Sequence, residues 1–413
     1  MVSKGSGRQW RLVSLFQILV VALAFAAGSP VAVAGAQIAT SDTVSTAPDL
    51  AVPDFDEGTV WAVEPWPTRS ANTAVVSGVG IGGIVRISLT RHKVMWSVPG
   101  NAKALLRIHR RLYVGTPTGV SRYTPPSLTP DWSIDLGGQV STLEPHPQVG
   151  KIVAGGDFPG AVTVLNTDGT RDSAYGIPEI KGRGYPNSGP TGIYRADMQP
   201  WGNRYIAIGE FTTVGGLSRS QAVMLEFGPT EATVSSWDMP TLHELCAQET
   251  PQYLRDAEWD HSGTRIAFTA TGKGGGFPDG EMCDSASTVS GLGESGDMVP
   301  TITKFCGDTG HSVEWTPDDT GLFVSGHFKC VAATPGLRNF QSRFGIALLD
   351  MPTQTLDAWR SDKCRGVGAR ELAWSSGLLV GYDCGFWGNN EAINPDPTPR
   401  ISLGRFAFLP QVE

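Results

Sequence analysis

Short apolar stretches alternate with turn-forming residues along nearly the whole chain. Residues 151–158 and 161–165 are one example, in which two apolar-rich stretches flank a proline-glycine turn. This pattern is typical of antiparallel strands, and the longer periodicity of amphipathic helices is absent after the first 36 residues. The sequence therefore predicts an all-β fold built from many short strands.

A strand-turn-strand unit recurs along the chain, and a second pair of strands follows it, as in residues 161–175 and 222–237. Four strands per repeat, at a period of roughly 40 to 60 residues, are typical of propeller blades rather than of a sandwich. We therefore expect residues 37–413 to form a single seven-bladed β-propeller. The hairpins that open the repeats lie within residues 60–77, 104–115, 142–158, 195–211, 246–283, 306–330 and 364–384.

The last repeat ends at residues 405–410 with only three predicted strands. A ring of blades that failed to close would leave an unpaired sheet edge and an exposed apolar blade face. We therefore expect a strand from residues 41–55, near the N-terminus, to complete the last blade.

The N-terminus has the three parts of a signal peptide. Lys4, Arg8 and Arg11 precede an apolar run at residues 12–27, and small residues follow at 32–36. A membrane anchor is the competing interpretation, but the run is shorter than the roughly 20 residues that span a bilayer. We expect cleavage near residue 36, no membrane span afterwards, and a secreted or cell wall-associated protein.

The charge excludes some partners. The formal net charge of −8 falls to about −11 once the basic leader is removed. The densest basic cluster, residues 107–111, holds only three basic residues and one histidine. Such a chain repels nucleic acid and anionic lipid. We expect a monomer whose partner is an extracellular protein or carbohydrate.

All six cysteines lie in the second half of the chain, within residues 241–413. Residues at equal distances from a hairpin turn lie opposite one another, which brings cysteines at the open ends within bridging range. We expect disulfide-stapled blades in this half, with the pairs Cys246–Cys283, Cys306–Cys330 and Cys364–Cys384.

Two segments resemble a known repeat family: Val-Ala-Gly-Gly-Asp-Phe at 153–158 with the stretch 164–176, and residues 209–220. They are similar to delta-60 repeats, a bacterial β-propeller family with a GGDF, a VGG-x-x-R loop and an LN-x-DGS-x-D hairpin. The likeness is best in residues 150–240 and weak in the N-terminal repeats. It implies a propeller fold and surface exposure, and no catalytic residues.

Four polar residues occupy one repeat position at the predicted mouth of the propeller. There they would bind a cation or a sugar, or else hydrogen-bond the loop of their own blade. Trp387, in the long last loop, is the candidate for an exposed contact, and we favour this loop face of the last three blades as the ligand site. The four polar residues are Asp157, Glu210, His327 and Asp383.

An acidic row recurs toward the other end of the first strands, at Glu144, Asp197, Glu258 and Glu314. These carboxylates would hold Ca²⁺ or, as we favour, cap exposed turn amides. The histidines show no metal-ligand spacing, so the sequence assigns no metal site and leaves the cofactor unknown.

The favoured function is a secreted, non-catalytic scaffold that binds a protein or glycan through the loop face of blades five to seven. The alternative is a secreted hydrolase or lyase acting on a polysaccharide or small lactone. A carboxylate pair with a raised pKa in the channel mouth would favour the enzyme. An exposed Trp387 among dispersed charges would favour binding. The sequence names no catalytic residue, and we lean against catalysis.

Overall fold

The computed structural model is all-β: the residues that it describes form many small antiparallel sheets and no helix. None of these residues belongs to a helix that is long and apolar enough to cross a membrane. The predicted signal peptide, residues 1–36, lies outside the described residues. The structure describes residues 44–45, 47–49, 55, 58–68, 72–183, 189–239, 253–272, 282–293, 301–306, 309–334, 339–361, 363–364, 366, 368–387, 401–402 and 405–412.

The first half of the chain forms sheets in which sequential strands pair, as the hairpin pattern predicts. The first sheet contains β1 (Thr59–Pro65), β2 (Thr73–Val79), β3 (Ile84–Ser88) and β4 (Lys93–Val98). The next contains β5 (Ala104–Ile108), β6 (Arg111–Gly115), β7 (Gly119–Tyr123) and β8 (Trp132–Asp135). The third contains β9 (Val140–Pro145), β10 (Lys151–Gly156) and β11 (Val162–Asn166). The fourth contains β13 (Gly192–Met198), β14 (Arg204–Glu210), β17 (Ala222–Phe227) and β18 (Ala232–Val234).

The second half continues in the same way, with small additions. One sheet contains β19 (Tyr253–Trp259), β20 (Arg265–Thr271), β21 (Ser285–Ser290), β22 (Thr301–Cys306), β25 (Cys330–Ala332) and β26 (Phe340–Ser342). The next contains β23 (Gly310–Trp315), β24 (Gly321–Gly326), β27 (Ile346–Asp350) and β28 (Thr355–Leu356). The last contains β29 (Ala369–Trp374), β30 (Gly377–Tyr382) and β33 (Phe406–Pro410). Shorter sheets are formed by β12 (Ile180–Lys181), β15 (Thr213–Val214) and β16 (Leu217–Ser218), and by β31 (Phe386–Trp387) and β32 (Ile401–Ser402).

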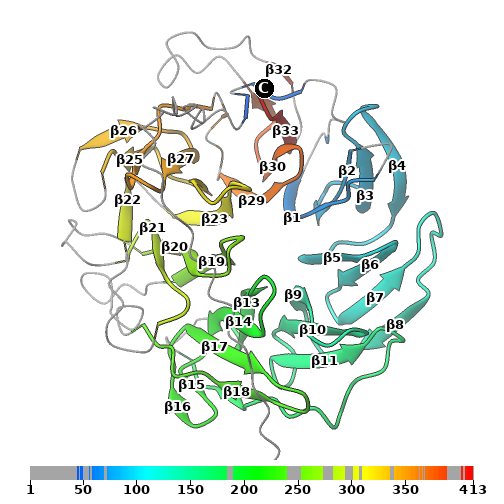
Figure 1. Ribbon diagram of the computed structural model, residues 1–413. Helices are drawn as coiled ribbons and strands as arrows, with labels where there is room; N and C mark the ends of the chain where they lie inside the picture. Colours follow the sequence, from blue (N-terminus) through cyan, green and yellow to red (C-terminus); the bar gives the residue numbers. More distant parts are fainter. Residues whose placement is uncertain are drawn as a thin grey trace, which may run out of the picture. The chain divides into compact units, whose positions relative to one another are not determined.

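Consecutive sheets pack face to face through apolar clusters. The first strands contact one another in the order β1, β5, β9, β13, β19, β23 and β29, and β29 in turn contacts β1. They lie nearest the middle of the view in Figure 1, with the later strands of each sheet outside them. Ile206 and Phe268 meet in one cluster between neighbouring sheets, and Val60 and Leu379 meet in the cluster between the first and last sheets. This buried area is the main stabilising term, because each strand alone has too little apolar surface.

The segment that precedes β1 lies along β33, where the closing strand was predicted. The backbone amides of Ser45 and Asp49 donate to the carbonyl oxygens of Pro410 and Phe408, each at 2.8 Å. Val44 is buried, and its carbonyl accepts from the indole nitrogen of Trp359 at 3.1 Å. The described residues of this segment pair with the edge of the last sheet without being assigned as a strand.

Two of the predicted disulfides are confirmed, with Cα–Cα distances of 5.1 Å for Cys306–Cys330 and 6.4 Å for Cys364–Cys384. Cys306 ends β22 and faces Cys330 at the start of β25. The first bridge therefore joins outer strands rather than the hairpin β23–β24 itself. The expected four-strand repeat fails here, because the insertion β25–β26 pairs with the edge of the preceding sheet and extends it to six strands.

The third predicted pair is open to a direct test. Cys283 is disulfide-bonded, whereas Cys246 lies outside the described residues. We expect proteolysis of the unreduced protein to release one peptide pair that joins Cys246 to Cys283, detected by mass spectrometry with and without reduction. The two confirmed bridges are the internal control. A peptide that joins Cys246 to any other cysteine would contradict the hairpin argument.

Candidate functional site

The first strands carry a β-bulge near their starts, and each bulge turns one extra side chain out of the regular alternation. In β13, Ile193 pairs with Gly209 and Arg195 pairs with Ile208, which leaves Tyr194 without a residue opposite it. The same register shift recurs in the other first strands except β5, which pairs without a shift. The extra residues are Trp61, Ser141, Tyr194, Arg255, His311 and Arg370.

Glycines in the second strands make room for these bulges. A Cβ atom on Gly209 would lie 2.0 Å from the carbonyl oxygen of Gly192, and one on Gly156 would lie 2.0 Å from that of Gln139. Gly155 and Gly156 both belong to β10, and Gly156 faces the bulged strand at close range.

The bulged residues line a cavity of about 490 Å³, which we call the mouth cavity. Its wall also includes Lys103, Arg195 and Tyr253, which come from the same ends of the first strands. The predicted mouth of the propeller lies at this end, since the Cys364–Cys384 bridge closes the open end of the hairpin β29–β30. The cavity has the size of a small-ligand site.

The mouth cavity combines cations with aromatic rings. Lys103, Arg195, Arg255 and Arg370 contribute positive charge, and no acidic residue is among the described residues that line it. The ammonium of Lys103 lies 5.7 Å from the ring centre of Trp61, and the guanidinium of Arg255 lies 6.0 Å from that of Tyr253. Cation–π contacts of this kind orient a charge without neutralising it.

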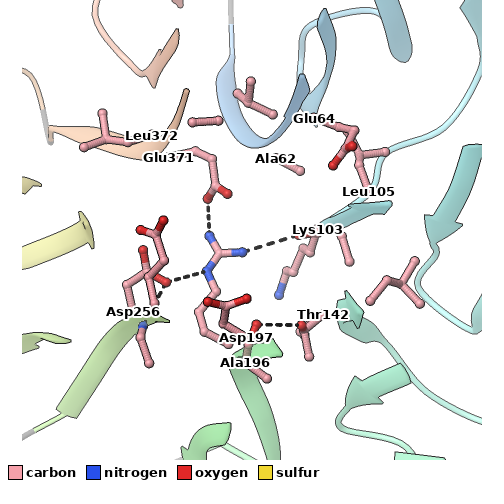
Figure 2. Close-up of a pocket in the computed structure, with 18 of the residues that line it drawn as sticks. Ala62, Glu64, Lys103, Leu105, Thr142, Ala196, Asp197, Asp256, Glu371 and Leu372 are labelled. Atoms are coloured by element: carbon pink, nitrogen blue, oxygen red, sulfur yellow. Dashed lines mark hydrogen bonds and ion pairs between the residues drawn. The ribbon is translucent and has the colours of Figure 1, made fainter. Parts of the chain in front are cut away.

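A second cavity, of about 220 Å³, lies further along the same strands, and we call it the acidic cavity. Arg195, Lys103 and Ser141 line both cavities. Figure 2 shows Glu64, Asp197, Asp256 and Glu371 reaching the acidic cavity from different strands. Its carboxyl groups are those of Glu64, Glu144, Asp197, Asp256, Glu258, Glu314 and Glu371.

Five of these carboxyl groups stand three residues after a bulge, and each accepts a hydrogen bond from the backbone of the next sheet. Asp197 accepts from the amide of Trp259 at 2.7 Å, and Glu64 accepts from that of Arg107 at 3.2 Å. Glu144, Glu258 and Glu314 accept in the same way from Met198, Trp315 and Trp374. A first strand is a sheet edge with amides that need partners, so these acids serve as inter-sheet links.

Burial changes the ionisation of the linking carboxyl groups. It raises the pKa of Glu64 to about 8 and the pKa of Asp197 to about 7. Burial, together with neighbouring carboxylates, also raises the pKa of Glu144, Glu258 and Glu314 well above the ordinary value. Glu64 is therefore largely protonated near neutral pH and Asp197 about half protonated, and a protonated carboxyl group still has an oxygen that can accept an amide hydrogen bond.

Arg195 is the cation between the two cavities. Its Nη2 atom pairs with Oε2 of Glu371, and its Nε atom lies 3.9 Å from Oδ1 of Asp256. Burial alone would lower the pKa of Arg195, but the charges of Glu371 and Asp256 outweigh burial and raise the pKa above its usual value. Arg195 therefore stays charged and forms the floor of the mouth cavity.

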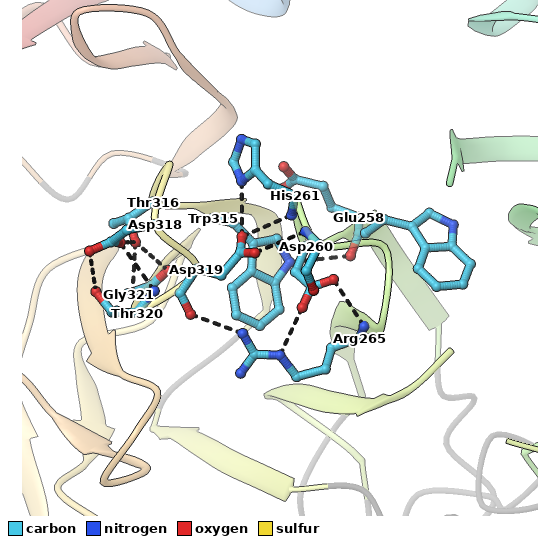
Figure 3. A network of polar contacts seen from close by, with 12 residues as sticks. Glu258, Asp260, His261, Arg265, Trp315, Thr316, Asp318, Asp319, Thr320 and Gly321 are labelled. Carbon is cyan, nitrogen blue, oxygen red and sulfur yellow. Dashed lines mark hydrogen bonds and ion pairs between the residues drawn. The ribbon is translucent and has the colours of Figure 1, made fainter. Parts of the chain in front are cut away.

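The turn-capping role that the sequence analysis favoured for the acidic row belongs to other acids, so that prediction is wrong. Asp319, in the turn between β23 and β24, accepts from the backbone amides of His261 and Ser262 at 2.8 and 2.9 Å. Asp260 accepts from the amide of Thr264 at 2.7 Å and pairs with Arg265 at 2.9 Å. Figure 3 shows this network joining the turns of two neighbouring sheets. No group of three or more His, Cys, Asp or Glu side chains among the described residues has a metal-binding arrangement.

The four polar residues expected at the ligand site do share one repeat position, at or just after the end of a second strand. None of them lines the mouth cavity or the acidic cavity. Asp157 is exposed and Glu210 is buried. Asp383 accepts from the amide of Gly368, in its own repeat, at 3.2 Å. His327, directly after β24, is half-buried.

Trp387 is fully buried, with 0% of its surface exposed, so the prediction of an exposed contact is wrong. Trp387 belongs to the short pair β31–β32 and to an apolar cluster, in which its ring centre lies 5.8 Å from that of Tyr382 in an edge-to-face arrangement. The long loops expected to form the ligand face lie largely outside the described residues. The bulged residues were not among the predicted site residues, although five of the six stand three positions before an acid in the sequence.

Comparison with known proteins identifies no family. No family model matches the sequence, and no curated protein matches it. Among 819 matching chains of solved structures is hydrazine synthase of Kuenenia stuttgartiensis, with a TM-score of 0.53 and 13% sequence identity. The match covers 86% of this chain and 98% of that chain. It is a β-propeller-like neighbour, and at this identity the likeness concerns the fold alone.

The bulge geometry predicts a large cost for a single methyl group. We expect Gly209→Ala to lower the free energy of unfolding by roughly 2 kcal/mol or more, because the new Cβ meets backbone that cannot rotate away. Gly385→Ala is the matched control, since a Cβ there meets nothing within 4 Å. Urea unfolding measures both variants. Equal stability of the two would contradict the close approach.

The linking carboxyl groups predict an unusual pH dependence of stability. The folded state keeps protons that the unfolded chain releases above its ordinary pKa of 4.5, so stability falls as pH rises from there to about 8. Glu64→Gln keeps an oxygen that can accept the Arg107 amide but does not titrate. We expect it to flatten the decline by on the order of 1–3 kcal/mol in urea unfolding above about pH 5. The exposed control Glu231→Gln should leave the slope unchanged, and an identical slope for Glu64→Gln would refute the assignment.

Proposed function

We propose that residues 37–413 form a single seven-bladed β-propeller, with the segment before β1 as the outer strand of the last blade. The cyclic contacts of the first strands support this arrangement, as do the apolar cluster between first and last sheets and the hydrogen bonds of Ser45 and Asp49 to β33. The family resemblance in residues 150–240 fits the same architecture, and we propose that the chain is a divergent delta-60-type propeller.

We propose that the protein is a secreted, non-catalytic recognition scaffold that binds a glycan or protein at the mouth cavity. One observation carries this proposal: the bulges direct side chains from six first strands into a single cavity. A rigid wall of strands orders its contact residues before binding, which reduces the entropic cost of association. Disulfide-bonded cysteines support the proposed secretion, because such bonds persist in oxidising compartments.

A second candidate function is catalysis by the acidic cavity. Clustered carboxyl groups with raised pKa values lie directly below the mouth, as a hydrolase or lyase would require. Against this interpretation, Glu64 and Asp197 are engaged by backbone amides of neighbouring sheets. Glu371 is engaged by Arg195. Binding therefore remains the better-supported function.

The binding proposal predicts that the mouth residues, and not other exposed aromatics, determine affinity. We expect the mature chain to bind a subset of an array of polysaccharides and extracellular proteins, with Trp61→Ala weakening the best ligand by about tenfold or more. Trp201→Ala is the control, because Trp201 is fully exposed in the turn between β13 and β14. Biolayer interferometry measures the affinities.

Two results would contradict the proposal. Equal loss in both tryptophan variants would place binding outside the mouth cavity. The other result is that the protein releases new reducing ends or an opened lactone from the bound ligand. If Glu371→Gln abolished that release, the enzyme hypothesis would replace the scaffold hypothesis.

A further inference from the structure

We infer that the mouth cavity binds the end of an acidic saccharide, a chain that terminates in a carboxylate-bearing sugar. This inference rests on the proposed binding function and specifies its ligand.

The charge at the mouth opposes the charge of the whole chain. The formal net charge is −8, yet the described residues that line the mouth cavity include Lys103, Arg195, Arg255 and Arg370 and no acid. A cavity lined by cations focuses a positive potential that attracts an anionic ligand. Lys103 and Arg255 are exposed and lie beside aromatic rings that line or adjoin the cavity.

Arg370 adds a second indication of an anionic ligand. It is a bulged residue, and its Nε atom is buried without a hydrogen-bond partner among the described residues. Buried guanidinium nitrogens are normally paired, and a carboxylate is the acceptor that matches their planar geometry. A ligand carboxylate in the mouth cavity would meet Arg370 through the part of its side chain that lines the cavity.

The aromatic residues favour a sugar over an acidic peptide. Trp61, Tyr194 and Tyr253 present rings at the same cavity as the cations. A pyranose ring has C–H faces that pack on such rings and hydroxyl groups that hydrogen-bond polar neighbours, so one residue of a saccharide uses both kinds of side chain. A glutamate side chain has no comparable face.

The floor of the cavity indicates that a chain end is recognised. Arg195 lines both cavities and is held there by Glu371 and Asp256. Below it the linking carboxyl groups are engaged with neighbouring sheets, and the smaller cavity offers acids rather than donors to an anion. A saccharide that enters the mouth therefore stops at Arg195, and the rest of its chain points outward.

The test compares matched ligands by isothermal titration calorimetry with the mature chain. The probes are a galacturonate trisaccharide, a hyaluronan tetrasaccharide, the methyl ester of the first, a neutral trisaccharide and a hexaglutamate peptide. We expect an acidic saccharide to bind at least about tenfold more tightly than its ester or the neutral sugar, and more weakly at high salt.

Arg255→Ala and Arg370→Ala should each weaken that binding by about tenfold or more, while Arg110→Ala, an exposed arginine in the turn between β5 and β6, should not change it. Thermal melting of each variant separates lost binding from lost folding. Tryptophan-dependent binding of a neutral glycan or a protein, insensitive to both arginine variants, would overturn the acidic sugar while keeping the proposed function. If hexaglutamate bound as tightly as the acidic saccharide, the inference that the ligand is a sugar would be overturned. If no glycan or protein bound at all, both proposals would be overturned.

Discussion

The hydrogen bond from a backbone amide of one sheet to a buried carboxyl group of the previous sheet is the interaction on which this structure depends. Each sheet begins with an edge strand, and an edge that faces other protein has amides that water cannot reach. Apolar packing presses neighbouring sheets together, but it does not fix how far one slides along the next. The pairs Asp197 with Trp259 and Glu64 with Arg107 fix that position, because each links two sheets at a specific residue.

The bulges and the linking carboxyl groups are structurally coupled, because the bulge determines which way the acid three residues later points. An extra residue in a strand shifts the alternation by one, so the residues before and after it no longer follow a single pattern of faces. In β13 this lets Tyr194 reach the mouth cavity while Asp197, three residues later, reaches the neighbouring sheet. Because the glycine opposite the bulge has no side chain, the two backbones come close enough for the shift to persist. Function at the mouth and cohesion between sheets therefore depend on the same local irregularity.

Much of the architecture follows from the sequence, because hairpins and cysteine pairs are local patterns. Cys364–Cys384 was predictable from distance to a turn alone, whereas Cys306–Cys330 was predicted on the same basis although its bridge joins β22 and β25. The site was not predictable to the same degree, since a bulge moves a side chain by one position and leaves almost no trace in composition. Trp387 is a second example: its burial depends on the pairing of β31 with β32 and on contact with Tyr382, which no local pattern encodes. The repeated acids could be recognised in the sequence. Their hydrogen-bond partners could not, because these are backbone amides of another sheet, and the sequence does not show which amide each acid contacts.

The charges of the two cavities affect each other, because the cations of the mouth cavity lie next to the carboxyl groups of the acidic cavity. Seven carboxyl groups directly below four cations would, if fully ionised, draw those cations inward and cancel the field at the mouth. Burial opposes this, because it raises the pKa of Glu64 and of Glu371 to about 8 and that of Asp197 to about 7, which lowers the negative charge of the group near neutral pH. Arg195 pairs with Glu371 and lies beside Asp256, so it faces what negative charge these two carboxyl groups carry. The exposed cations Lys103 and Arg255 line the mouth cavity above this arrangement, so the polarity of the mouth is connected with the way the sheets are linked.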